Sequence, residues 1–145
     1  MERSKTIGFV VKTLSNQLKR QIDISLSKGD IEAVTGMQSW VIGYLCDNLG
    51  KEDVFQKDVE TQFKIRRSTA TGILQLMEKN GLITRESVSC DARLKKLILT
   101  EKAICIHERI EAEIILLEKR ITKDLTQEEL ETFFRIINKI SKNIE

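Results

Sequence analysis

The sequence predicts a mainly α-helical protein that carries one short β-hairpin. Along most of its 145 residues, apolar side chains recur at intervals of three and four positions, which is the period of an amphipathic helix. Residues 83–88 and 94–99 break this pattern, because they are short runs with β-branched side chains on either side of the polar segment 89–93. Gly50 and Gly81 follow two of the helical patterns, where glycine can adopt the left-handed conformation that ends helices.

Two helices are expected before residue 50. The first covers residues 7–26, where one apolar stripe is formed by Ile7, Val10, Val11, Leu14, Leu18, Ile22 and Leu26. The second begins after Thr35, which stands in the capping-box relation to Gln38, and ends near Asn48.

The middle of the chain predicts a helix-turn-helix followed by the hairpin. A short helix is expected over residues 56–63 and a longer one over residues 67–79, with Ile73, Leu74 and Met77 on its buried side. Two short helices joined by a tight turn form a helix-turn-helix. This segment is also the basic part of the chain, because residues 56–102 contain 10 Lys and Arg against 6 Asp and Glu.

Two further helices are expected after the hairpin. Thr100 caps a helix that runs to about Lys123, and Thr126 forms a capping box with Glu129 at the start of the last helix. The last helix carries the stripe Leu130, Phe133, Phe134, Ile137, Ile140 and Ile144. The first and last stripes exceed what a domain of this size needs, so they predict a homodimer; the alternative is that they pack within one subunit.

Composition excludes several classes of protein. No apolar run approaches the ~18 residues of a membrane span and no secretory signal is recognisable, so a cytoplasmic protein without membrane contact is expected.

Three widely spaced cysteines predict free thiols, with Cys46 and Cys105 buried and Cys90 exposed. His107 is the single histidine, so we expect neither catalytic residues nor a metal or cofactor, and no enzyme.

Five short motifs, in order and at matching spacing, resemble those of the multiple-antibiotic-resistance regulator (MarR) family. They are Thr35-x-x-Gln38, residues 68–71 (Ser-Thr-Ala-Thr), residues 77–83 (Met-Glu-Lys-Asn-Gly-Leu-Ile), Asp91-x-Arg93 and Leu99-Thr100. The sequence departs from the family pattern at Glu60, Ala92 and Ala103, where alanine, arginine and glycine are common, and at Gly72, where a basic residue is common.

The resemblance implies a winged helix-turn-helix with N- and C-terminal dimerisation helices. Residues 1–145 would form one domain, with a DNA-binding lobe at 31–100 and dimerisation helices at 1–30 and 101–145. The implied function is sequence-specific binding of double-stranded DNA at a palindromic operator, as a transcriptional repressor relieved by a small aromatic effector.

The residue types in these segments suit that function. Arginine, glutamine, serine and threonine match base edges and phosphates in the major groove, and the recognition helix offers Arg66, Arg67, Ser68, Thr69, Thr71 and Gln75. In the wing, the resemblance assigns a minor-groove contact to Arg93 and an orienting role to Asp91, and Lys95 and Lys96 would meet phosphates. Trp40 and Tyr44 are candidates for the effector cleft.

Several alternatives remain open. Ser68 or Thr69 would cap the recognition helix instead of contacting DNA, and Trp40 and Tyr44 would be ordinary core residues. A thiol-based redox-sensing regulator is a second functional class. A winged helix that binds protein instead of DNA is a third.

Overall fold

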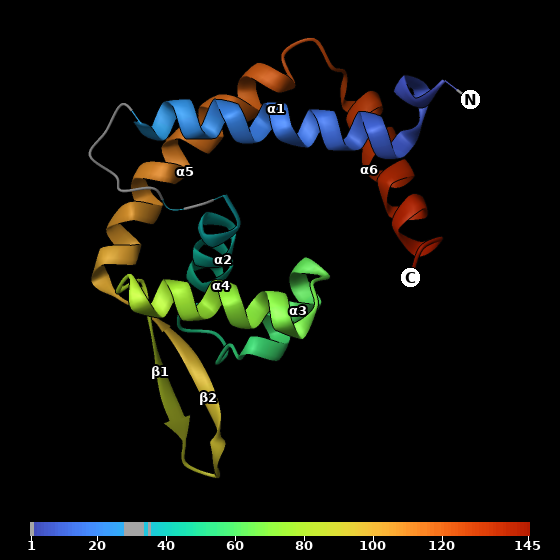
Figure 1. The fold of residues 1–145 in the computed structure, drawn as a ribbon. Helices are drawn as coiled ribbons and strands as arrows, with labels where there is room; N and C mark the ends of the chain where they lie inside the picture. The colour runs from blue at the N-terminus through green and yellow to red at the C-terminus, as the bar shows by residue number, and fades with distance from the viewer. Residues whose placement is uncertain (1, 28–33, 35) are drawn as a thin grey trace. The chain divides into compact units, whose positions relative to one another are not determined.

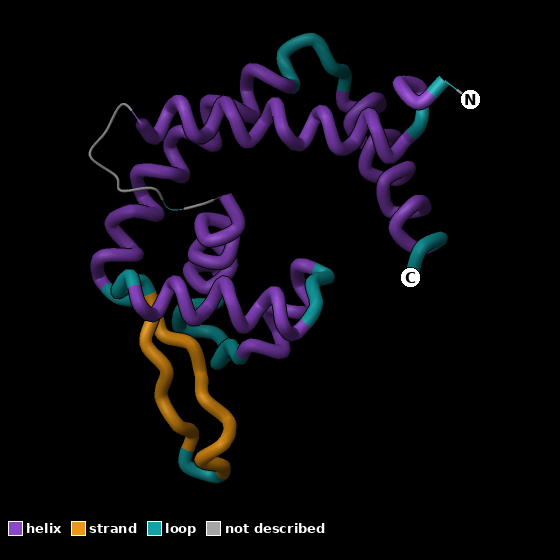
Figure 2. Tube along the Cα trace, viewed as in Figure 1, coloured by secondary structure: helices purple, strands orange, loops and turns teal. Residues whose placement is uncertain are grey.

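The computed structural model describes residues 2–27, 34 and 36–145, and it confirms the predicted fold class of helices with one antiparallel hairpin (Figures 1 and 2). A 3-10 turn at Arg3–Lys5 precedes the first helix. The elements are α1 (Ile7–Ser27), α2 (Gly36–Asp47), α3 (Gln56–Phe63), α4 (Arg67–Lys79), β1 (Ile83–Val88), β2 (Asp91–Leu99), α5 (Glu101–Ile121) and α6 (Gln127–Lys142). The chain divides into two compact units, Met1–Ile114 and Ile115–Glu145.

Helix ends follow local chemistry. Gly50 and Gly81 have φ angles of 73° and 70°, the left-handed conformation that was expected after α2 and α4. Lys64 adopts the same region at φ 50° as it ends α3, which is uncommon for a residue with a Cβ atom. Thr126 accepts a hydrogen bond from the Glu129 amide at 3.2 Å and completes the predicted capping box of α6. The box predicted for α2 lies outside the described residues, because it requires Thr35.

The hairpin differs from the prediction at its tip. We expected the second strand to start at Leu94, but β2 begins at Asp91, so the connection to β1 is shorter than expected. Val88 pairs with Asp91, and the register shifts between Ser87 and Val88. The polar composition of the tip concealed this pairing, because a hairpin tip in water does not need apolar residues.

One hydrophobic core holds the first unit together. Val41 and Ile42 of α2, Val59 of α3, and Leu74 and Met77 of α4 are fully or almost fully buried. The base of the hairpin adds Leu97 and Leu99, and the first half of α5 adds Ala103 and Ile110. The wing is therefore anchored in the same core that supports α4.

A backbone hydrogen bond joins the hairpin to the segment before α3. The Leu97 amide donates to the Val54 carbonyl at 2.8 Å, and Phe55 and Lys96 form an isolated antiparallel bridge.

Gln38 is also buried in this unit, and its Oε1 has no hydrogen-bond partner among the described residues.

The two predicted apolar stripes at the ends of the chain are largely exposed, although Leu18, Ile22, Leu130 and Ile140 are half-buried. In the first unit, α1 leaves Ile7, Phe9, Val10, Val11 and Leu14 open to solvent. In the second unit, α6 exposes Phe133, Phe134, Ile136 and Ile137, and it has no buried residue.

None of the helices within the described residues is long and apolar enough to cross a membrane.

Candidate nucleic-acid interface

The helix-turn-helix is held by contacts between α3 and the first turns of α4. The Gln56 side-chain amide donates to Thr71 Oγ1 at 2.8 Å, and it also reaches the Arg67 carbonyl at 3.4 Å. Between the helices, the Ile65 amide donates to the Glu60 carbonyl at 3.1 Å. Glu60 itself is half-buried, as expected for a carboxylate that keeps access to water.

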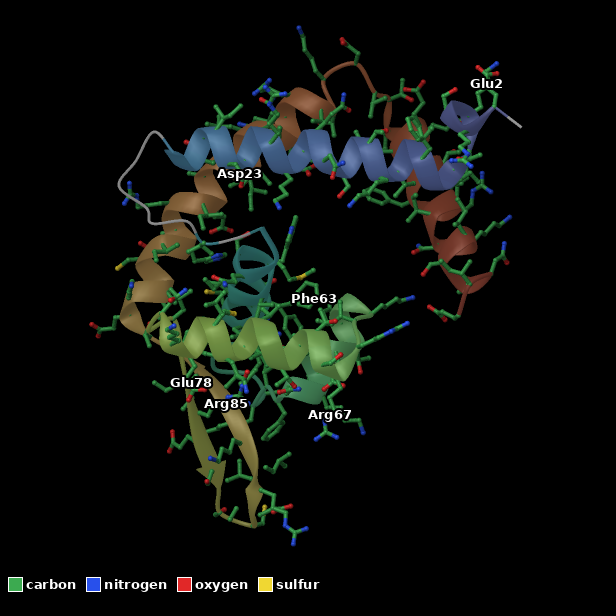
Figure 3. All side chains as sticks on the ribbon, viewed as in Figure 1. Glu2, Asp23, Phe63, Arg67, Glu78 and Arg85 are labelled. Atoms are coloured by element: carbon green, nitrogen blue, oxygen red, sulfur yellow. The ribbon has the colours of Figure 1, made fainter. Side chains whose placement is uncertain are left out.

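Helix α4 has a buried side and an exposed side. Ala70, Leu74 and Met77 are fully buried, and Ile73 is half-buried beside them. The side turned to solvent carries small and polar groups with one leucine, namely Ser68, Thr69, Gly72, Gln75, Leu76 and Lys79. Arg66 and Arg67 are exposed at the start of the helix, where Figure 3 shows Arg67.

The alternative role for Ser68 and Thr69 as helix caps is wrong. The N-cap residue of α4 is Arg66, with extended backbone angles, and no side chain makes a capping hydrogen bond there. Ser68 and Thr69 lie inside the helix, and both residues are exposed to solvent.

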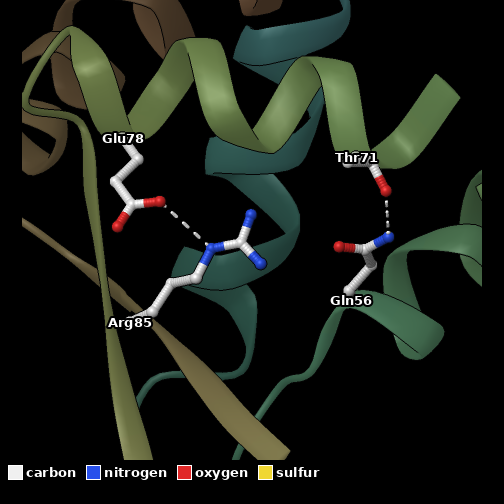
Figure 4. A network of polar contacts seen from close by, with 4 residues as sticks. All are labelled: Gln56, Thr71, Glu78 and Arg85. Carbon is white, nitrogen blue, oxygen red and sulfur yellow. Dashed lines mark hydrogen bonds and ion pairs between the residues drawn. The ribbon is translucent and has the colours of Figure 1, made fainter. Parts of the chain in front are cut away.

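Two polar contacts brace α4, one near each end (Figure 4). Near its start, Thr71 receives the hydrogen bond from Gln56, so this predicted DNA-contacting residue is half-buried and already engaged. Near its end, Glu78 accepts from Arg85 Nε of β1 at 3.2 Å. The second contact ties the hairpin to α4.

The predicted wing residues fall into two groups. Arg93 and Lys95 are exposed, and the Asp91 carboxylate accepts from the Arg93 amide at 2.9 Å, which shapes the backbone next to Arg93. Lys96 is half-buried, lies opposite Glu86 in the register, and pairs with Asp53 at 3.6 Å. Lys95 is thus the freer of the two cations for a partner.

The two aromatic residues of α2 have different surroundings. Trp40 is 52% exposed, so the alternative that it is a core residue is wrong. Tyr44 is half-buried and meets Phe63 edge-to-face, with ring centroids 5.9 Å apart. Burial raises the pKa of the Tyr44 hydroxyl, and the charges of Asp58 and Glu52 raise it further. The Tyr44 hydroxyl therefore stays protonated at neutral pH. Its ring packs against the core.

The cysteine predictions are partly wrong. Cys90 is exposed as expected, but Cys105 is exposed as well, because it lies on the side of α5 opposite the buried residues Ala103 and Ile110. Cys46 is half-buried, and its thiol pKa is raised by burial and then by Asp47, Glu111 and Glu108. Within the described part of the chain, no group of His, Cys, Asp and Glu could hold a metal ion.

Three contacts at this site could not be found by sequence reasoning. Gln56–Thr71, Glu78–Arg85 and Asp53–Lys96 join residues that are 15, 7 and 43 positions apart. No periodic pattern links such pairs, because their approach depends on how α3, α4 and the hairpin pack.

Comparisons with known proteins identify the family of this fold. The MarR family model matches residues 34–94. The transcription regulator MarR from Oenococcus oeni PSU-1 is 34% identical, with a TM-score of 0.78 over 94% of this chain and 99% of that chain. The heme sensor protein PefR from Streptococcus agalactiae, solved with heme, is 27% identical, with a TM-score of 0.67 over 96% of this chain and 94% of that chain.

A third structure, S. aureus MepR in complex with DNA, shares the fold. It is 22% identical with a TM-score of 0.85, and the match covers 100% of both chains. The order of helices and hairpin, the motifs of residues 68–83 and the relative at 34% identity agree: the chain belongs to the MarR family of winged-helix regulators.

Proposed function

We propose that this protein regulates transcription by binding a specific double-stranded DNA sequence as a homodimer, and that it is not an enzyme. The observation that carries the proposal is the exposed side of α4, which presents hydroxyl, amide and guanidinium groups on a helix fixed to the core. Two further observations support it: the basic segment 56–102, and the MarR from Oenococcus oeni, which is a transcription regulator.

In the proposed mechanism, α4 enters the major groove. A helix of ~10–12 Å diameter fits that groove, where base edges differ in their donors and acceptors. Ser68, Thr69 and Gln75 face the bases, and Arg66 and Arg67 meet bases or phosphates at the start of the helix. Thr71 stands at the flank, where the bond from Gln56 sets its orientation.

The wing contacts the adjacent minor groove. Arg93 inserts there, and Asp91 holds the backbone that carries it. Lys95 meets a phosphate without disturbing other contacts, whereas Lys96 must leave Asp53 before it can do so. The wing thereby adds affinity that depends more on the shape of the DNA than on its bases.

Dimerisation supplies the second half-site. Residues 31–100 form the DNA-binding lobe, and residues 1–30 and 101–145 join two copies through the apolar faces of α1 and α6. A two-fold dimer presents its recognition helices about one helical turn, ~34–36 Å, apart, which requires a palindromic operator.

The regulator acts in the cytoplasm as a repressor that a small aromatic molecule releases from DNA. Trp40 supports this part of the proposal, because an indole ring that is 52% exposed on α2 is available for stacking. The related PefR, a heme sensor, binds a flat aromatic macrocycle.

The experiment that tests the proposal is selection of binding sites from random duplex DNA, followed by affinity measurements against salt. We expect a palindromic consensus, and sedimentation at micromolar concentration as a dimer of twice 16.7 kDa. Lys95→Ala should weaken binding to all sequences and lower the slope of log affinity against log salt by about one unit. Failure to bind any duplex at low salt would favour the protein-binding alternative.

A further inference from the structure

The exposed side of α4 lacks a side chain at its centre. Successive residues of an α-helix are rotated by about 100°, so Gly72 lies opposite the buried residues Ala70, Leu74 and Met77. Ser68 precedes Gly72 by one turn, and Leu76 follows it by one turn, on the same side of the helix. The middle of the proposed DNA-facing surface is therefore bare backbone.

The fold itself does not require glycine at this position. The φ angle of Gly72 is not in the left-handed region, and a Cβ atom added there would meet no atom within 4 Å. Glycine inside a helix is less stable than alanine by about one kcal/mol, because it loses more conformational freedom. A residue that costs stability and fills no packing role in the free protein points to a requirement at the surface.

Leu76 is the second unusual residue on this surface. It is 43% exposed, although its neighbours on the same side are polar. An isolated exposed leucine is ordinary, but this one follows Gly72 by one turn on the same side of the helix. We use the word notch for two neighbouring features of this surface, the bare backbone at Gly72 and the isobutyl group of Leu76 one turn later, which lie beside the polar groups of Ser68 and Gln75.

We propose that this notch reads the methyl group of one thymine in each half-site. The proposal rests on the proposed function, because it places α4 in the major groove. There, the C5 methyl of thymine is the one apolar group that the four base pairs display. Gly72 lets the helix backbone approach the base, and Leu76 covers the methyl group.

The expected effect follows from the size of one methyl group. Burial of a methyl-sized apolar group strengthens binding about four-fold, so removal of the methyl from both half-sites should weaken binding about sixteen-fold. Alanine at position 72 would occupy the notch and force the helix outward, which should weaken binding about ten-fold.

The test uses the selected palindrome with deoxyuridine in place of thymidine, which removes only the methyl group. Each symmetric pair of thymines is replaced in turn, and the affinity of the full-length dimer is measured. We expect one pair to show the sixteen-fold loss with the wild-type protein. Leu76→Ala should bind the thymine and uracil duplexes equally, whereas Leu49→Ala, which alters an exposed leucine outside α4, should keep the difference.

Stability measurements distinguish a DNA-contacting role of Gly72 from a purely structural one. Gly72→Ala should raise the melting temperature by about 2–4 °C, since alanine favours the helix, and yet weaken binding to the selected site. A purely structural glycine would lose stability and affinity together. Cytosine replaced by 5-methylcytosine elsewhere in the site serves as the control for methyl groups in general.

The outcomes separate the two proposals. If the wild-type protein prefers no DNA sequence, the proposed function fails. If it binds a specific palindrome but tolerates uracil at every position, or if Leu76→Ala still distinguishes thymine from uracil, the thymine notch is overturned and the proposed function stands. Equal affinity of Gly72→Ala and wild type would likewise overturn it.

Discussion

The hydrogen bond from Gln56 to Thr71 allows the stability of the helix-turn-helix to be measured separately from its binding to DNA. Thr71→Val removes the hydroxyl and keeps the β-branched shape, so the Gln56 amide is left with the Arg67 carbonyl at 3.4 Å. A neutral hydrogen bond contributes a net ~0.5–1.5 kcal/mol. Because Thr71 is half-buried, we expect a loss of about 1 kcal/mol in the free energy of unfolding.

The measurement is a double-mutant cycle in urea, with Thr71→Val, Gln56→Met and the double variant. The coupling energy should be about 0.5–1.5 kcal/mol. Thr69→Val is the matched control, because Thr69 is exposed on the same helix, and it should change stability by less than about 0.5 kcal/mol. If the effects of the two substitutions on the free energy of unfolding add within about 0.3 kcal/mol, the hydrogen bond does not stabilise the helix-turn-helix. The structural role given to Thr71 would then be refuted.

Three further predictions concern other local features. Lys64→Gly should raise the free energy of unfolding in urea by about 0.5–1 kcal/mol. The strain of a side chain at φ 50° is removed, and this gain outweighs the conformational entropy that glycine adds to the unfolded chain. A loss of stability would contradict this expectation. Thr126→Ala should reduce the helical circular dichroism of the last helix and cost about 1 kcal/mol, whereas Thr126→Ser should cost little. In thiol labelling of the folded protein near pH 8, Cys90 and Cys105 should react before Cys46, whose raised pKa leaves less thiolate; equal rates at all three would argue against this ordering.

Local sequence signals predicted most of the fold, because each depends on neighbouring residues. The bounds of α3 and α4 follow from the apolar period, and the ends of α4 and α6 follow from Gly81 and Thr126. The start of β2 was predicted three residues late, since the pairing of Asp91 with Val88 uses backbone groups that composition does not reveal.

The candidate site was less predictable than the fold. The choice of α4 and the hairpin required only element types, and it stays a prediction; Arg67 and Gln75 are exposed in the structure. Which side chains are already engaged depends on packing between distant segments. The sequence analysis assigned phosphate contacts to both Lys95 and Lys96, but in the structure Lys96 pairs with Asp53. Cys105 was expected to be buried in the core, although it is exposed to solvent.

The arrangement of contacts around α4 has a consequence for how such a protein acquires new targets. Gln56 of α3 and Arg85 of β1 hold α4 near its two ends, and the core holds its inner side. The outward positions of α4 therefore contribute little to the stability of the fold. Under the proposed function, substitutions at Ser68 or Gln75 would alter the chemistry presented to DNA while the fold keeps its shape. After gene duplication, a copy of this gene could change its operator through a few surface substitutions, each with a small effect on stability.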